Sequence, residues 1–417
     1  MKTAIIFLFL YCTLNTINLY CQNYCMPGRF TNEYYFQSRD IQVDKDIIYG
    51  HAIDENGKTI LLDLDVFYPK FSVDNLKQRP FIMLIHGGGG NKTSMYRFCP
   101  LFAERGFVIA TITYRTQLNG DPISGRNVYQ SIQDAHAALR YLVSNEDKYG
   151  IDTNAIFIGG QSLGAVSSTS IAYLDQQDFD VLLPNIEKIA GRIDNSTNNL
   201  KTKFKIRGVI DMWGQIADTS FISSEEAHNI PIIMFHGTAD SSYVKSVQIS
   251  KRFKNLGGCY QLHTKTGAGH GQNMSKYYIA AKASCFIKSI FCGSCYQLER
   301  EINNKDITCD LPSRGDSTLW VRNFKPLNII LNKQFNGEFR YLDEDRNERV
   351  LNVSSENGHL FLCEKGDTEK TELFPESEND FYIKDFNAQI SFNLDVHRKV
   401  IGLRYYIDAQ EIFAKKK

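Results

Sequence analysis

The chain has 417 residues, of which 43% are hydrophobic and 23% are charged, a composition typical of a globular protein rather than a disordered or fibrous one. Lysine plus arginine and aspartate plus glutamate each number 47, so the formal net charge is zero and no strong field favours nucleic acid or an anionic membrane. The sequence contains neither a metal-ligand spacing nor a dinucleotide-binding glycine fingerprint, so we expect no metal and no cofactor.

The amino terminus has the pattern of a targeting segment. Lys2 gives a positive start, and the apolar run Ala4 to Tyr11 has the length of a signal-peptide core but is too short to span a membrane. We therefore expect residues 1–21 to be a signal peptide and the protein to be secreted or periplasmic, without strong membrane association. A retained anchor and a lipoprotein attached through Cys21 are the alternatives.

The chain has ten cysteines, and loss of Cys12 and Cys21 with the signal peptide leaves eight. An even number in a chain sent to an oxidising compartment predicts some disulfides, whose connectivity the sequence does not give. The C-x-x-C spacing of Cys292 and Cys295 favours a structural disulfide over a redox or zinc role, because no second ligand pair has matching spacing. Four cysteines cluster where the alternation of apolar runs and helical patterns ends, namely Cys285, Cys292, Cys295 and Cys309.

The region from Thr59 to about residue 291 alternates apolar runs with helical patterns, after a stretch from Asn23 that is expected to wrap around the core. This alternation predicts an α/β fold with a mostly parallel sheet flanked by helices, and the short β-branched strands fit burial on both faces. Strands are predicted at 59–68, 81–86, 107–114, 155–159, 206–212, 231–236 and 259–264, and helices near 94–105, 128–144, 163–174, 243–255 and 274–291.

A glycine loop, His86 to Gly90, follows the predicted strand at 81–86. Glycines let a backbone approach a ligand closely and turn its N–H groups toward it. Such a loop can donate hydrogen bonds to the oxyanion that forms when a hydroxyl group attacks an acyl carbon. A flexible glycine turn without such a role is the alternative.

Ser162 lies in the motif Gly160-Gln161-Ser162-Leu163-Gly164, between the apolar run 155–158 and a predicted helix that begins at Leu163. Strand, sharp turn and helix are the context that makes a G-x-S-x-G motif a nucleophile elbow. The turn is tight enough to require glycine at both ends of the motif. We expect Ser162 to be a nucleophile and the backbone N–H of Leu163 to be an oxyanion donor.

The segment from Asp175 to Lys205 interrupts the alternation of strands and helices, and it is long for a connection. It could be a lid or a surface loop, and we expect a loosely packed cap that includes a short amphipathic helix. Two aromatic residues near strand ends, Tyr114 and Trp213, could line a substrate pocket, although ordinary packing is the alternative for both.

Asp240 and His270 lie in loops just beyond predicted strands, where catalytic groups gather in open α/β sheets. With Ser162 they stand in the chain order Ser, Asp, His of the α/β-hydrolase triad. In that arrangement His270 takes the proton from Ser162, and Asp240 holds the imidazole in the correct tautomer. Asp211, which also follows an apolar run, is the alternative acid.

These motifs, from about Ile60 to Phe291, resemble the α/β-hydrolase superfamily, in particular secreted bacterial carboxylesterases with a His-Gly-Gly-Gly oxyanion motif. The resemblance implies that Gly88 and Gly89 donate to the oxyanion. It also implies a catalytic domain over 22–300. The nucleophile motif reads Gln-Ser-Leu-Gly, whereas the hormone-sensitive-lipase-like branch usually reads Asp-Ser-Ala-Gly.

The pattern of the sequence changes after Cys309, where helical periodicity ends. Short runs of alternating apolar and polar residues then predict a separate all-β sandwich or barrel. Phrases such as Phe335 to Phe339 and Ile390 to Phe392 are similar to the lipocalin-like domain appended to some bacterial serine β-lactamase-like peptidases. The resemblance implies a small barrel-like domain over 310–417, which could bind an apolar group, shape an active-site entrance or serve only as a structural addition.

The expected activity is that of a secreted serine carboxylesterase acting on a small-molecule or polysaccharide-linked ester. The resemblance implies acetyl, feruloyl or short-chain acyl groups. A serine peptidase or amidase with the same triad, and a non-enzymatic binding protein, are the alternatives. Nucleic acid is not an expected partner, and the oligomeric state stays open.

Overall fold

The computed structural model describes residues 24–54, 56–116, 125–194, 197–309, 333–343, 345–383 and 387–417. The predicted signal peptide, residues 1–21, lies outside these residues. Two compact units are found, one from the described residues of Met1–Glu33 and Val43–Ser317 and one from those of Tyr34–Gln42 and Thr318–Lys417. The predicted domain boundaries stay predictions.

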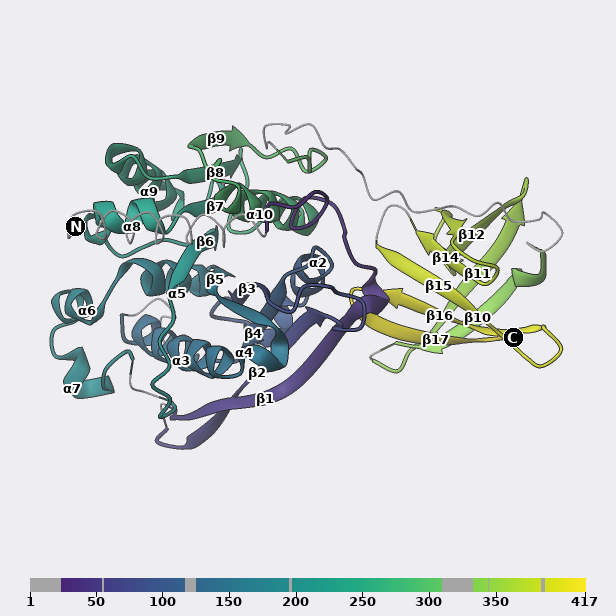
Figure 1. Ribbon diagram of the computed structural model, residues 1–417, viewed down its shortest axis with the longest axis horizontal. Helices are drawn as coiled ribbons and strands as arrows, with labels where there is room; N and C mark the ends of the chain where they lie inside the picture. Colours follow the sequence, from purple (N-terminus) through teal and green to yellow (C-terminus); the bar gives the residue numbers. More distant parts are fainter. Residues whose placement is uncertain are drawn as a thin grey trace, which may run out of the picture. The chain divides into compact units, whose positions relative to one another are not determined.

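The first unit is built on a nine-stranded sheet with the strand order β1-β2-β4-β3-β5-β6-β7-β8-β9 (Figure 1). Strands β3 to β9 pair in parallel, whereas β2 is antiparallel to β4. The strands are β1 Ile41–Ile53, β2 Thr59–Pro69, β3 Arg79–Ile85, β4 Val108–Ile112, β5 Ile151–Gln161, β6 Ile206–Met212, β7 Ile232–Gly237, β8 Tyr260–Lys265 and β9 Leu298–Glu301.

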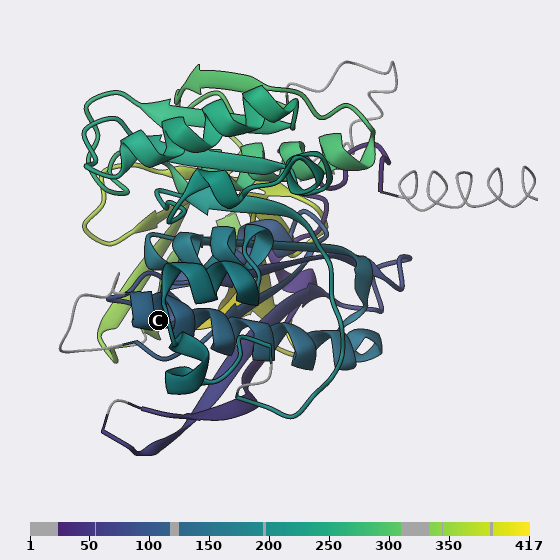
Figure 2. The same cartoon turned by 90° about the vertical axis from the view of Figure 1, so that its left-hand side faces the viewer.

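Helices cover both faces of this sheet. All seven residues of β3 are buried, and because successive side chains of a strand point to opposite faces, neither face of β3 meets solvent. Helices α3 and α5 run side by side (Figure 2), and α2 packs against α10. The helices are α2 Cys99–Ala103, α3 Gly125–Ser144, α4 Glu146–Tyr149, α5 Leu163–Tyr173, α6 Gln176–Leu182, α7 Ile186–Ala190, α8 Ser224–Asn229, α9 Tyr243–Leu256 and α10 Lys276–Phe291.

The predicted α/β class with a mostly parallel sheet is therefore confirmed. Two strands were not predicted. The stretch expected to wrap around the core contains the edge strand β1, whose middle carries the charged run Asp44 to Asp46, and β9 adds a short strand at the opposite edge.

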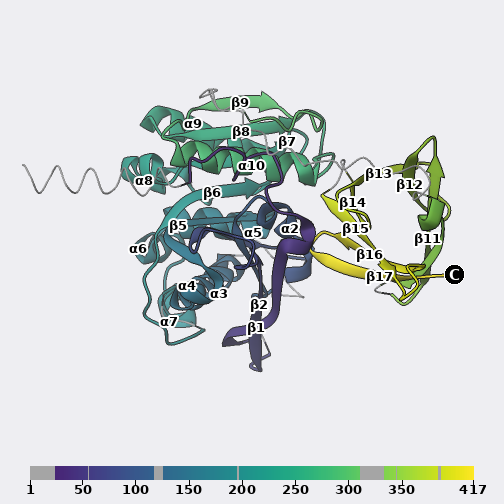
Figure 3. The same cartoon turned by 45° about the vertical axis from the view of Figure 1, so that its right-hand side comes forward.

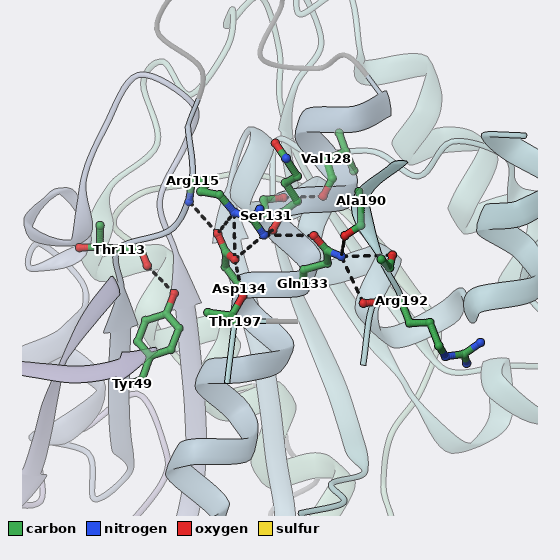
Figure 4. A network of polar contacts seen from close by, with 12 residues as sticks. Tyr49, Thr113, Arg115, Val128, Ser131, Gln133, Asp134, Ala190, Arg192 and Thr197 are labelled. Carbon is green, nitrogen blue, oxygen red and sulfur yellow. Dashed lines mark hydrogen bonds and ion pairs between the residues drawn. The ribbon is translucent and has the colours of Figure 1, made fainter. Parts of the chain in front are cut away.

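The segment 175–205 contains two short helices, α6 and α7, and is fastened to α3 rather than loosely packed. The Gln133 amide donates to the carbonyl oxygens of Ala190 at 2.8 Å and Arg192 at 3.1 Å, at the end of α7 (Figure 4). The Tyr129 hydroxyl donates to Gly191 O at 2.7 Å. Buried side chains of α3 thus satisfy the carbonyl groups that the end of a helix leaves without partners.

Asp134, also on α3, is fully buried and joins the end of β4 to the same segment. Its carboxylate accepts hydrogen bonds from the backbone N–H of Arg115 at 2.8 Å, from the Arg115 guanidinium at 2.7 Å and from the Thr197 hydroxyl at 2.8 Å (Figure 4). A buried carboxylate is stable only when its charge is paired and its oxygen atoms are hydrogen-bonded, and both conditions hold here.

Three disulfides confirm the predicted use of cysteine in the first unit. They join Cys25 to Cys292, Cys259 to Cys295 and Cys285 to Cys309. The two cysteines of the C-x-x-C motif have different partners, so neither is free for a redox or zinc role. Among the described residues, Cys99 and Cys363 are unpaired.

The second unit is a closed antiparallel barrel in which β10 to β17 follow in chain order (Figure 3). Its core is filled by side chains that include Phe335, Phe339, Phe381 and Phe392. The predicted all-β, barrel-like part is thus confirmed. Its strands are β10 Gly337–Leu342, β11 Glu348–Glu356, β12 His359–Glu364, β13 Thr371–Pro375, β14 Asp380–Ile383, β15 Ala388–Leu394, β16 Val400–Ile407 and β17 Gln410–Lys416.

A segment from the other end of the chain completes this unit. The short helix Ser38–Asp40 packs on the barrel, and the Ser38 hydroxyl accepts from the backbone N–H of Ala409 at 2.6 Å. The Asn387 amide donates to Phe36 O at 2.6 Å. The sequence pattern gave no sign of this contribution.

No helix within the described residues is both long and apolar enough to cross a membrane.

Candidate active site

Ser162 stands at a sharp turn between β5 and α5, with the backbone angles φ 55° and ψ −121°. A positive φ is strained for serine and persists only where the surroundings enforce it. The glycines on both sides allow the turn to pack closely against β3, because a Cβ atom on Gly160 or Gly164 would overlap the carbonyl oxygen of Ile85 at the end of that strand. This close packing holds the turn in place. The motif therefore forms the predicted elbow, which pins the serine against the neighbouring strand.

The structure brings the three predicted triad residues together. His270 Nε2 lies 2.8 Å from Ser162 Oγ, and His270 Nδ1 lies 2.5 Å from Asp240 Oδ2. The side chain of His270 is 52% exposed whereas that of Asp240 is only 5% exposed. A half-exposed imidazole is thus held by a shielded carboxylate on one side and faces a serine hydroxyl on the other, an arrangement compatible with a nucleophile, a base and an orienting acid.

The surroundings of Asp240 keep it ionised. Burial alone raises the pKa of this carboxyl, but hydrogen bonds from the Ser242 N–H, from His270 and from the Ser242 hydroxyl outweigh burial and lower the pKa to about 2. Ser242 N and Oγ both lie 2.9 Å from Asp240 Oδ1, so this oxygen is held separately from the one that faces His270.

His236 also contacts Asp240, a contact that the sequence pattern did not predict. Its Nε2 atom lies 3.2 Å from Asp240 Oδ2, and its Nδ1 atom lies 2.7 Å from Ser246 Oγ. One feature of the sequence is compatible with this contact. His236 lies near the end of a strand and Asp240 follows it by four residues in a loop, so the loop can fold back and bring the carboxylate to the imidazole.

The glycine loop lies beside the serine. A Cβ atom on Gly87 would be only 3.4 Å from Ser162 Cβ. The N–H of Gly90 donates to Gly87 O at 3.0 Å and closes a turn with Gly88 and Gly89 in its centre, so the turn's own hydrogen bond leaves their N–H groups free. Leu163 is the first residue of α5, where a backbone N–H has no partner within the helix.

His86 and Tyr114 brace this loop from below. The Tyr114 hydroxyl donates to His86 O at 2.8 Å, and the two rings stack with their centroids 4.3 Å apart. Burial lowers the pKa of His86 to about 4, so its ring is neutral, and its Nδ1–H donates to Gly87 O at 2.7 Å. Tyr114, a suggested pocket residue, is buried beneath the loop.

Trp213, the other suggested pocket residue, lies beside the base. Its ring centroid is 6.4 Å from that of His270, and a Cβ atom on Gly271 would be 3.0 Å from the indole. Only 6% of Trp213 is exposed. The indole therefore packs under the loop that carries His270 and leaves little surface for a ligand.

Asp211, the alternative acid, is fully buried in β6 beside the elbow. Its Oδ1 atom accepts from the Gly214 N–H at 2.6 Å, and its Oδ2 atom has no hydrogen-bond partner among the described residues. Burial raises the pKa of Asp211 to about 7. The structure thus places Asp240, and not Asp211, against His270.

Other features of the described residues lie apart from this site. A surface hollow of about 450 Å³ beside α9 is lined by residues that include Lys245, Lys251 and Arg252, and none of the predicted site residues lines it. No group of three or more histidine, cysteine, aspartate or glutamate side chains suited to a metal ion occurs in the described part of the chain.

Comparisons with known proteins point to esterases. Residues 64–229 match the family model described as BD-FAE. A stretch of 118 residues, 26% of this chain and 20% of the relative, is 31% identical to gut esterase 1 of Caenorhabditis elegans. A stretch of 144 residues, 34% of this chain and 30% of the relative, is 31% identical to the probable isoprenylcysteine alpha-carbonyl methylesterase ICME of Oryza sativa subsp. japonica.

The chain thus spans less than a third of the length of either curated relative. Among solved structures, a truncated form of a carbohydrate esterase from gut microbiota has a TM-score of 0.44 and 19% identity, over 63% of this chain and 99% of that chain. The resemblance of the first unit to the α/β-hydrolase superfamily is confirmed by its fold and by the match of residues 64–229, which contain Ser162, to the BD-FAE family.

Proposed function

We propose that the first unit is a serine carboxylesterase in which Ser162, His270 and Asp240 form a catalytic triad. The observation that carries this proposal is the continuous chain of contacts from Ser162 Oγ through His270 to Asp240, at distances of 2.8 Å and 2.5 Å. The partial matches to proteins named as esterases support the reaction class.

The reaction follows from the geometry. Ser162 Oγ attacks the ester carbonyl carbon while His270 Nε2 accepts its proton, and the N–H groups of Gly88, Gly89 and Leu163 stabilise the oxyanion. His270 returns the proton to the departing alkoxide, which leaves an acyl-enzyme. His270 then takes a proton from water, whose oxygen attacks the acyl carbon, and returns this proton to Ser162 Oγ as the acyl–oxygen bond breaks and the acid is released.

The substrate class that we propose is a small or polysaccharide-linked ester with an acetyl, feruloyl or short-chain acyl group. His270 is half exposed, so a bulky alcohol portion can approach the base. We also propose that the protein is secreted after loss of residues 1–21. The three disulfides support this, since disulfides persist in oxidising compartments.

Hydrolysis of p-nitrophenyl acetate, butyrate and octanoate, and of a peptide p-nitroanilide, tests the proposal with wild type and Ser162→Ala side by side. The exposed Ser72→Ala is the matched control. We expect rapid ester cleavage in wild type and in the control, and a loss of about 10⁴-fold or more in kcat for Ser162→Ala. Preference for the anilide would indicate the peptidase instead, and ester turnover that survives in Ser162→Ala would overturn the triad.

A further inference from the structure

We propose that His236 is a positioning residue of this site, a second imidazole that holds the Asp240 carboxylate in the orientation that His270 requires. This inference rests on the proposed function, because it concerns the acid of the same triad. Asp240 Oδ2 is the shared point, since His270 Nδ1 lies 2.5 Å and His236 Nε2 lies 3.2 Å from this one oxygen atom.

The fold fixes His236 more firmly than it fixes His270. His236 belongs to β7, which has a strand on each side in the sheet, and is fully buried, whereas His270 lies on a loop and is half exposed. The next residue, Gly237, allows the loop that carries Asp240 to lie against the loop that carries His270, because a Cβ atom on Gly237 would overlap the carbonyl oxygen of Ala268. The rigid strand therefore supplies the reference point from which the acid and the base are aligned.

The protonation states give each hydrogen bond a direction. Burial lowers the pKa of His236, so its ring is neutral and carries one N–H. Asp240 is ionised and can only accept, so the proton lies on His236 Nε2, which is 3.2 Å from Asp240 Oδ2 and 3.2 Å from Ser242 Oγ. His236 Nδ1 is then an acceptor, and the Ser246 hydroxyl, 2.7 Å away, donates to it.

A relay of donors thus runs from Ser246 through His236 to Asp240, and it meets the relay from Ser162 through His270 at the same carboxylate. Ser242 holds the other oxygen atom, Oδ1, through its N–H and its hydroxyl. With both oxygen atoms held by groups other than His270, the carboxylate cannot rotate when His270 moves. Orientation of this kind lowers the barrier because little reorganisation is needed during the reaction.

Loss of the His236 donor has a predictable sign. Charge on Asp240 Oδ2 that is no longer shared with His236 favours the imidazolium form of the proposed base more strongly, so the acid limb of the activity profile is expected to move to higher pH. The groups that face His270 are Asp240, Ser162 and the Trp213 ring, and those that face His236 are Asp240, Ser242, Ser246 and the Tyr243 ring. Asp240 is the one ionised carboxylate among these groups, so it dominates the effect.

A pair of amide variants separates the hydrogen bond from mere packing. In His236→Gln, the side-chain NH₂ group takes the place of Nε2 and can still donate to Asp240, whereas in His236→Asn it takes the place of Nδ1 and cannot reach Asp240. His263→Asn is the matched control, because His263 is a fully buried histidine in the adjacent strand β8 that bonds to Tyr278 and Gln261 instead.

The measurement is the pH profile of kcat/KM for p-nitrophenyl acetate, with active sites counted by titration with a phosphonate so that unfolded protein does not enter the rates. For His236→Asn we expect kcat to fall about tenfold with little change in KM. We also expect the acid limb to move to higher pH by roughly half a unit. His236→Gln should recover most of both effects, and His263→Asn should show neither.

Equal rates and equal acid limbs in His236→Asn and His236→Gln would overturn the inference, as would a shift of the same size in His263→Asn. The outcome is distinguishable from failure of the proposed function. If turnover depends on Ser162 but not on the amide at position 236, only the positioning role fails. If turnover survives in Ser162→Ala, the triad itself fails.

Discussion

Ser162 has a backbone conformation that serine seldom adopts, and the structure shows what imposes it. The positive φ of Ser162 is found at the turn between β5 and α5, where its hydroxyl faces His270. Gly160 and Gly164 allow the chain to pack closely against Ile85 at the end of β3. Strain of this kind costs about 1–3 kcal/mol and is compatible with folding only because the surrounding sheet is extensively buried. The strained backbone lowers the stability of the fold and in return fixes the position of Ser162 Oγ.

Replacement of Ser162 by two small residues tests this strain. Ser162→Ala removes the hydroxyl but keeps the Cβ atom, whereas Ser162→Gly removes both and accepts a positive φ freely. We expect Ser162→Gly to have a free energy of unfolding about 1 kcal/mol higher than Ser162→Ala in urea, after allowance for the greater freedom of glycine in the unfolded chain. A glycine variant that is less stable than the alanine variant would contradict the strained elbow.

Asp211 gives a prediction for the dependence of stability on pH. Its pKa is raised to about 7 by burial, from an ordinary value of 3.8 in the unfolded chain. Between these two values the unfolded state releases a proton that the folded state retains, so Asp211 destabilises the fold increasingly as the pH rises from about 4 to 7.

In Asp211→Asn this penalty is removed, while the amide oxygen still accepts from the Gly214 N–H. We expect the free energy of unfolding in urea to be roughly 1–3 kcal/mol higher than in wild type at pH 8 and no higher at pH 4, because the unpartnered amide group offsets part of the gain. A difference between variant and wild type that is the same at both pH values would show that Asp211 does not titrate in this range.

At the scale of elements, the segment 175–205 depends on polar side chains of α3. Gln133 and Tyr129 bind the carbonyl groups at the end of α7, and Asp134 binds Thr197. These polar contacts add to the burial of Phe179, Ile186 and Ile193, through which the segment joins the hydrophobic core of the first unit. The length and polarity of the segment suggested loose packing. The sequence pattern did not indicate that buried polar side chains of α3 would bind it.

The dependence on Gln133 can be measured. Gln133→Ala removes the donor from the part-buried carbonyl oxygens of Ala190 and Arg192, and a typical hydrogen bond contributes about 0.5–1.5 kcal/mol to stability. We expect a loss of that size in the free energy of unfolding, together with faster cleavage within 175–205 in limited proteolysis. Gln130→Ala, three residues earlier on the same helix, is the control and should change stability by less than about 0.5 kcal/mol.

The parallel strands and the helices between them could be predicted because each carries its own periodic pattern. For example, the stretch predicted as a strand at 206–212 is β6, and the helix predicted near 243–255 is α9. Strand β1 could not be found in this way, because its charged middle from Asp44 to Asp46 breaks the alternation of apolar and polar residues. What holds it in the sheet is pairing with β2, which no local pattern reports.

The same limit applies to the candidate site. Ser162, Asp240 and His270 could be placed because each follows a strand end, and parallel strands bring such ends to one edge of the sheet. His236 could not, since its contact with Asp240 depends on how one loop folds back on its own strand. Local motifs therefore identified the residues of the candidate triad, and tertiary packing decided which other side chains contact them.

At the scale of the whole molecule, disulfides hold distant parts of the first unit together. The Cys25–Cys292 bond joins residues 267 positions apart, so it ties the start of the described chain to the end of α10. A pairing across this distance has no signature in local sequence, which is why the connectivity could not be predicted. The same bond removes much of the freedom of the unfolded chain.

The contribution of this bond is testable. We expect Cys25→Ser/Cys292→Ser to lower the free energy of unfolding by about 2–5 kcal/mol, since a closed loop of this length restricts the unfolded state strongly. Cys363→Ser, at an unpaired cysteine in the barrel, is the control and should change stability by less than about 0.5 kcal/mol. Equal stabilities of the double variant and wild type would show that the bond does not constrain the unfolded chain.

The proposed function depends on activation of Ser162 as a nucleophile by His270 and Asp240. Its most direct test is covalent labelling with a fluorophosphonate, followed by mass spectrometry of the peptide that contains residue 162, in wild type, Ser162→Ala and His270→Ala. We expect stoichiometric modification of Ser162 in wild type and no modification of this peptide in Ser162→Ala. In His270→Ala we expect labelling of Ser162 to be slowed by at least about 100-fold. A label on another residue, or labelling of Ser162 at the same rate without His270, would contradict the proposed function.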